Sequence, residues 1–218
     1  MALTSATPRI DQATPQRLEA AVFGMGSFLR TEARFGIVRG VWKTTVGYGG
    51  GKSACPSCGD AGDHVEVVRV EYDPVTVSYG QLLELFLSWN SSSENPCFPQ
   101  YASCIFVKNE FEKRMAQAAL ERYRLCSDGP ADIRIATYKT FHMAPNRFQK
   151  YFLRTLLWLM KEVRHFYRDE IGFVRSTLSM RLNGIVGQLL PFTRLPEDIT
   201  LYDLDEDVVC TLEKYIAS

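Results

Sequence analysis

Short segments rich in β-branched and aromatic residues alternate with helix-type patterns along this sequence, and their order restricts the fold. We expect strands at residues 20–26, 38–48, 64–72, 102–107 and 132–138. Apolar residues at helical spacing predict helices at 27–35, 78–89, 109–122, 148–167, 176–190 and 203–216. The order predicts an α+β fold in which helices pack against one sheet.

The expected strand over residues 64–72 has two different faces. Successive side chains of a strand point to opposite sides, so Glu66 shares a face with Val68, Val70 and Tyr72. A carboxyl group on an apolar face tends toward a raised pKa and can then donate a proton. An ordinary ion pair between Glu66 and a Lys or Arg is the alternative.

The charge balance excludes several classes of partner. Twenty-five Lys and Arg balance twenty-five Asp and Glu in 218 residues, so the formal net charge is zero. General nucleic-acid binding needs an excess of positive charge, so we expect none. No apolar run reaches the roughly 18 residues of a membrane span. The N-terminal residues lack the apolar segment of a signal peptide, so we expect the cytoplasm and reduced cysteines.

Five blocks, in order, resemble the methionine sulfoxide reductase A family. They are Val22–Phe28 (VFGMGSF), Thr45–Gly51 (TVGYGGG), His64–Pro74 (HVEVVRVEYDP), Ser78–Trp89 and Gln100–Phe106 (QYASCIF). The resemblance covers roughly residues 20–190 and implies an α+β, ferredoxin-like core. We expect a flexible arm over 1–17, the reductase-like domain over 18–190 and a helical C-terminal extension over 191–218.

The resemblance implies a reaction, and one residue departs from it. The family reduces the S-epimer of methionine sulfoxide, free or in proteins, with a cysteine at a helix N-terminus and a glutamic acid that protonates the departing oxygen. Ser27 occupies the cysteine position in this sequence. A serine hydroxyl is almost never ionised near neutral pH, and oxygen is a poor nucleophile toward sulfur. We therefore expect the standard mechanism to be lost, with Ser27 acting as a helix N-cap or keeping some catalytic role.

The rest of the implied pocket is partly kept. Phe28, Glu66 and Tyr101 match family positions that hold the substrate methyl group and the sulfoxide oxygen. Leu29 stands where the family has a tryptophan, which removes the larger wall of the methyl cage. A second tyrosine of the family falls near Ala54, where this chain has none.

Cys55 and Cys58 form a Cys-x-x-Cys pair in the loop before Glu66. Two thiols at this spacing are ordinary loop residues, a replacement redox centre or part of a zinc site with Cys97 or His64. Cys104 and Cys126 are expected to pack in the interior. Lys150 and Arg154 are expected on a solvated basic face of the helix over 148–167.

The sequence thus predicts a divergent family member without a bound cofactor that still binds methionine sulfoxide or a related ligand through Phe28, Leu29, Glu66 and Tyr101. One alternative is an active thiol-dependent reductase that uses Cys55 and Cys58 and is recycled by thioredoxin or another thiol. The other alternative is a zinc-stabilised interaction protein.

Overall fold

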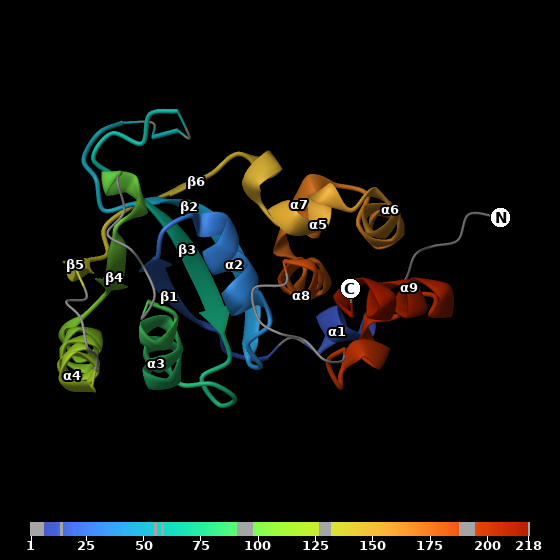
Figure 1. Cartoon of the computed structure of the whole chain (residues 1–218), viewed down its shortest axis with the longest axis horizontal. Helices are drawn as coiled ribbons and strands as arrows, with labels where there is room; N and C mark the ends of the chain where they lie inside the picture. The colour runs from blue at the N-terminus through green and yellow to red at the C-terminus, as the bar shows by residue number, and fades with distance from the viewer. Residues whose placement is uncertain are drawn as a thin grey trace.

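One mixed sheet organises the protein (Figure 1). The computed structural model describes residues 7–13, 15–54, 56–57, 59–90, 98–126, 132–187 and 195–217. The strands are β1 (Glu19–Gly24), β2 (Val41–Gly49), β3 (Val65–Tyr72), β4 (Ser103–Val107), β5 (Ile133–Thr137) and β6 (Phe141–Met143). Their order across the sheet is β5-β4-β1-β3-β2-β6.

The four central strands are antiparallel and follow the ferredoxin-like connection. The chain runs β1, α2 (Phe28–Gly36), β2, β3, α3 (Tyr79–Asn90) and β4. Helix α4 (Glu110–Cys126) then leads to β5, which pairs in parallel with β4. The predicted α+β class is therefore confirmed. The sheet has one more edge strand, β6, than the sequence predicts.

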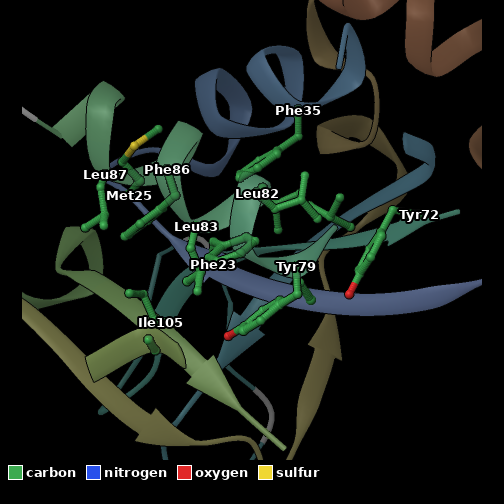
Figure 2. Close-up of a cluster of buried hydrophobic side chains, with 14 of the residues drawn as sticks. Phe23, Met25, Phe35, Tyr72, Tyr79, Leu82, Leu83, Phe86, Leu87 and Ile105 are labelled. Atoms are coloured by element: carbon green, nitrogen blue, oxygen red, sulfur yellow. The ribbon is translucent and has the colours of Figure 1, made fainter. Parts of the chain in front are cut away.

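The main core lies between this sheet and helices α2, α3 and α4. Phe23 of β1 is at its centre, with its ring centroid 5.1 Å from that of Phe35 and 5.1 Å from that of Phe86 (Figure 2). Val68 and Val70 of β3 join the same cluster, whereas Val67 packs in a smaller cluster with Val22, Cys104 and Phe106. The two predicted faces of β3 are thus confirmed.

A second apolar cluster joins the helices of the C-terminal part. These helices are α5 (Tyr151–Thr155), α6 (Leu157–Phe166), α7 (Glu170–Arg175), α8 (Thr177–Val186) and α9 (Glu206–Ile216). Helix α8 lies against α2 and so connects this cluster to the sheet domain (Figure 1). Within the described ranges, no helix is long and apolar enough to cross a membrane.

The N-terminal residues contain a structured segment where the sequence suggested a loose arm. Residues Arg9–Gln12 form the short helix α1, and the Ile10 side chain is buried in the second cluster. The Asp11 carboxylate accepts hydrogen bonds from the backbone N–H groups of Thr177 and Leu178 at the start of α8. Helix α1 therefore ties the N-terminal segment to the C-terminal helices.

The single long helix predicted over residues 148–167 is wrong. The chain forms a 3-10 turn, η2 (Asn146–Phe148), and then α5 and α6 as separate helices. Lys150 has a left-handed backbone with φ of 55°, which a continuous right-handed helix cannot contain. This backbone turns the Lys150 side chain into the protein, so its predicted place on a solvated basic face is also wrong.

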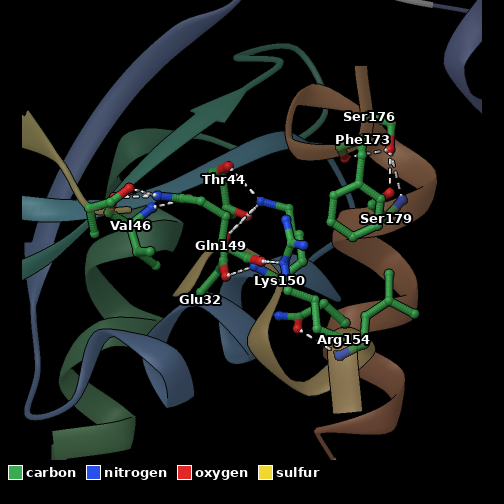
Figure 3. A network of polar contacts seen from close by, with 12 residues as sticks. Glu32, Thr44, Val46, Gln149, Lys150, Arg154, Phe173, Ser176 and Ser179 are labelled. Atoms are coloured by element: carbon green, nitrogen blue, oxygen red, sulfur yellow. Dashed lines mark hydrogen bonds and ion pairs between the residues drawn. The ribbon is translucent and has the colours of Figure 1, made fainter. Parts of the chain in front are cut away.

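Lys150 belongs to a buried polar network (Figure 3). Its Nζ lies 2.6 Å from Glu32 Oε1 and 2.8 Å from the Thr44 carbonyl oxygen. The adjacent Gln149 side chain accepts from the N–H of Val46 at 2.9 Å and donates to its carbonyl oxygen at 2.8 Å. These bonds fix the turn at η2 to α2 and β2, which matters because that turn borders the candidate site.

Candidate functional site

The site is built where β1 ends and α2 begins. Gly26 makes the turn with φ of 62°, and its N–H donates to the Tyr101 carbonyl oxygen at 3.1 Å. Tyr101 ends the 3-10 turn η1 (Pro99–Tyr101), and its half-buried ring meets that of Phe98 edge-on. The structure therefore brings the backbone of Tyr101 beside the turn that precedes α2.

Ser27 occupies the N-cap position of α2, but its side chain makes no capping hydrogen bond. The Glu66 carboxyl group caps the helix instead, because Glu66 Oε2 accepts from the Phe28 N–H at 3.0 Å. Ser27 is half-buried, and its hydroxyl does not bind the helix N–H group that a capping serine would usually bind. The predicted N-cap position is confirmed, and the expected capping bond is absent.

Glu66 is the buried titratable group of the site. It is only 3% exposed, and burial raises the pKa of its carboxyl group above 4.5, with the Phe28 hydrogen bond opposing part of that rise. No Lys or Arg of the described chain lies within ion-pair distance of it. Of the two alternatives, the geometry favours a carboxyl group held toward its neutral form over an ion pair.

Aromatic side chains surround Phe28. Its ring centroid lies 5.7 Å from that of Tyr48 and 5.7 Å from that of Phe148. Tyr48 of β2 faces Glu66 directly in the β2–β3 register, and it is fully buried. Leu29 is half-buried and packs against the main core. Glu66 thus meets the backbone of Phe28 directly after Ser27, with Leu29 on the same helical turn.

Sequence reasoning missed Tyr48 and Phe148 as neighbours of the site. Tyr48 ends a predicted strand, and the long loop between β2 and β3 does not fix the register that places Tyr48 opposite Glu66. Phe148 falls on a face of the predicted long helix, and the local sequence pattern gives no signal for the turn that brings it to Phe28.

The loop between β2 and β3 is closed at its base by Asp63 and His64. The Asp63 carboxylate accepts from the Ser53 hydroxyl and from the N–H groups of Ser53 and Lys52, and these bonds hold the pKa of that carboxyl group well below its usual range. His64 Nδ1 accepts from the Gly51 N–H at 3.3 Å, while its Nε2 lies 2.9 Å from the Ser53 carbonyl oxygen. This pattern suits a neutral imidazole with the proton on Nε2.

The cysteines fall into two groups. Cys55, Cys58 and Cys97 lie outside the described residues, so the redox and zinc hypotheses that depend on them stay predictions. Cys104 is buried as expected, and burial raises the pKa of its thiol to about 12. Cys126 is exposed, so its predicted packing role is wrong: it ends α4, where the helix leaves the core. Among the described residues, no three His, Cys, Asp or Glu side chains are grouped to hold a metal ion.

Fold and site together define a ferredoxin-like α+β protein with a buried carboxyl group at the N-terminus of one helix. A family model described as peptide methionine sulfoxide reductase matches residues 19–169. The chain belongs to the peptide methionine sulfoxide reductase family.

Curated relatives agree with this assignment, and a solved structure shares the fold. Peptide methionine sulfoxide reductase A5 of Arabidopsis thaliana is 37% identical over 187 residues, which cover 82% of this chain and 72% of the relative. Peptide methionine sulfoxide reductase MsrA of Cronobacter sakazakii is 35% identical over 151 residues, covering 63% and 71%. Reduced Mxr1 of Saccharomyces cerevisiae has the same fold, with a TM-score of 0.56 and 21% identity over 65% of this chain and 87% of that one. The plant match extends over more of this chain than the bacterial match does.

Proposed function

We propose that this protein binds methionine sulfoxide, free or within other proteins, and does not reduce it by the thiol mechanism of its family. The observation that carries the proposal is at the start of α2, where Glu66 binds the N–H of Phe28, the residue directly after Ser27. The buried carboxyl group is kept while the residue beside it has a hydroxyl and no thiol. The names of the relatives supply the ligand class.

The chemistry of a sulfoxide suits this site. Its oxygen is a strong hydrogen-bond acceptor, and its methyl group is apolar. A neutral Glu66 carboxyl group accepts from the Phe28 N–H with one oxygen and has a proton on the other to donate to the sulfoxide oxygen. The ring of Phe28 and the side chains of Leu29 and Tyr101 supply apolar surface for the methyl group.

A comparison of wild type with Ser27→Cys tests the proposal. Wild type should bind N-acetylmethionine S-sulfoxide methylamide in calorimetry and show no turnover with dithiothreitol. In the Ser27→Cys variant, the thiolate attacks the sulfoxide sulfur and takes the oxygen as a sulfenic acid, the thioether leaves, and dithiothreitol reduces the sulfenic acid with release of water. Turnover by this variant alone would support an intact pocket that lacks only its sulfur.

Other outcomes favour the two alternatives. Turnover by wild type that Cys55→Ser or Cys58→Ser abolishes would replace the proposal with a thiol-dependent reductase, and thioredoxin would then be the reductant to test. Zinc at one equivalent in purified protein would favour the interaction protein. Absence of binding in wild type would overturn the proposal altogether.

The cytoplasm is the compartment that we propose for this protein.

A further inference from the structure

Arg147 lies at the edge of the candidate site. Its guanidinium carbon is 4.6 Å from the centroid of the Phe148 ring, and that ring packs against Phe28. The Phe28 N–H is in turn bound by Glu66. The Phe148 ring therefore lies between the exposed Arg147 guanidinium and Phe28, the first residue of α2.

The turn that carries Arg147 is held rigidly. The two residues that follow Phe148 are Gln149, bonded through its side chain to β2, and Lys150, bonded to Glu32 of α2 (Figure 3). Both are fully buried. Stacking on Phe148 further limits the rotamers of the Arg147 side chain, so less conformational entropy is lost when its N–H groups bind a ligand.

The charge near this turn is positive and unpaired. In the described part of the chain, no carboxylate lies within 4.0 Å of the Arg147 guanidinium. The first turn of α2 contains no acidic residue, and a helix N-terminus carries a partial positive charge. The nearby Glu66 is held toward its neutral form. An anion is the group that this edge of the site would attract.

We propose that Arg147 binds a carboxylate of the ligand and so makes the site selective for acidic forms of methionine sulfoxide. This inference rests on the proposed function. A guanidinium stacked on a ring keeps its N–H edges free and can bind a carboxylate with two parallel hydrogen bonds. The carboxylate belongs either to free methionine sulfoxide or to an acidic residue beside it in a peptide.

Paired ligands that differ by one charge test the inference by calorimetry. N-acetylmethionine S-sulfoxide carries a carboxylate, and its methylamide carries none. Two further peptides place Glu or Gln next to an internal methionine S-sulfoxide, which distinguishes the two sources. Wild type should bind at least one acidic member about fivefold more tightly than its neutral partner, with the preference reduced in 0.5 M salt.

Three variants separate Arg147 from general charge effects. Arg147→Met should remove the preference and leave neutral binding unchanged, and Arg147→Lys should keep only part of the preference. Arg175→Met is the matched control, because Arg175 is also an exposed arginine but lies on α7. Circular dichroism spectra would show that each variant is folded.

The outcomes separate this inference from the proposed function. Equal binding of acidic and neutral ligands, or an acidic preference that persists in Arg147→Met, overturns the role of Arg147 and leaves sulfoxide binding in place. Failure of all four ligands to bind wild type overturns both. Loss of the acidic preference in Arg147→Met alone supports the inference.

Discussion

Removal of the Lys150 ammonium group should destabilise the protein strongly. Lys150 and Glu32 have no exposed side-chain surface, and Nζ contacts Glu32 Oε1 at 2.6 Å and the Thr44 carbonyl oxygen at 2.8 Å. In Lys150→Met, the Glu32 carboxylate keeps, among the described residues, only the N–H of residue 150 and the Thr44 hydroxyl as donors. Its charge is then buried without a counterion, and such a loss costs about 3–5 kcal/mol of unfolding free energy.

Urea unfolding measures this loss directly, and thermal unfolding gives a second measure. For a chain of this length, about 3–5 kcal/mol corresponds to a fall in Tm of roughly 6–20 °C. The double variant Glu32→Gln, Lys150→Met removes both charges, so it should be more stable than Lys150→Met alone. A cost below about 1 kcal/mol for Lys150→Met, or simple addition of the two single effects in the double variant, would refute the reasoning.

Three further perturbations follow from other contacts. Because burial raises the folded-state pKa of Glu66, wild type should lose stability as pH rises from 4.5 through that raised pKa, and urea unfolding at each pH should show no such loss in Glu66→Gln. Gly184→Ala places a Cβ 2.5 Å from Ile37 Cγ2 and 2.7 Å from the Ala33 carbonyl oxygen, so thermal unfolding should show a loss of about 1–3 kcal/mol. Asp11→Ala removes the acceptor for the first N–H groups of α8 and should cost about 0.5–2 kcal/mol in urea, whereas an unchanged midpoint would show that α1 does not stabilise α8.

The core of the sheet could be predicted because its signals are local. The alternation in β3 identifies the buried face, and the helical spacing of Leu82 and Phe86 identifies the face of α3 that meets Phe23. The break at Lys150 could not be predicted in this way. The left-handed residue there is bonded to Glu32, 118 residues away, and helix-type periodicity continues on both sides of the break.

Glycines where α2 and α8 meet show why local propensity misleads. Gly184 weakens a prediction of helix because glycine disfavours helix interiors. The structure places it where α8 crosses α2, and Gly36 at the end of α2 lies equally close to the backbone of Met180. Small residues at both positions let the two helix backbones approach. The stabilising contact therefore arises from packing between α2 and α8, and the sequence of either helix alone does not show it.

For Glu66, the sequence predicts the position in the sheet but not the hydrogen bond that the side chain makes. Its place on the apolar face of β3 follows from alternation alone. Its hydrogen bond to Phe28 does not follow from alternation, because a serine at position 27 predicts an N-cap whose own hydroxyl binds the helix N–H groups. The carboxyl group caps α2, and under the proposed function it has a second, separable task, which is to donate a proton to the ligand.

Two substitutions at Glu66 separate these tasks. Glu66→Gln keeps an acceptor for the Phe28 N–H, so its stability at neutral pH should be close to that of wild type. Glu66→Ala leaves that N–H without its partner and should cost about 1–3 kcal/mol in urea unfolding. Placed in the Ser27→Cys background, both should lose turnover, because neither supplies a carboxylic acid proton to the departing oxygen. Full turnover with Gln at this position would show that the proton comes from elsewhere, and equal destabilisation by Gln and Ala would show that the charge of Glu66, not its capping bond, holds the start of α2.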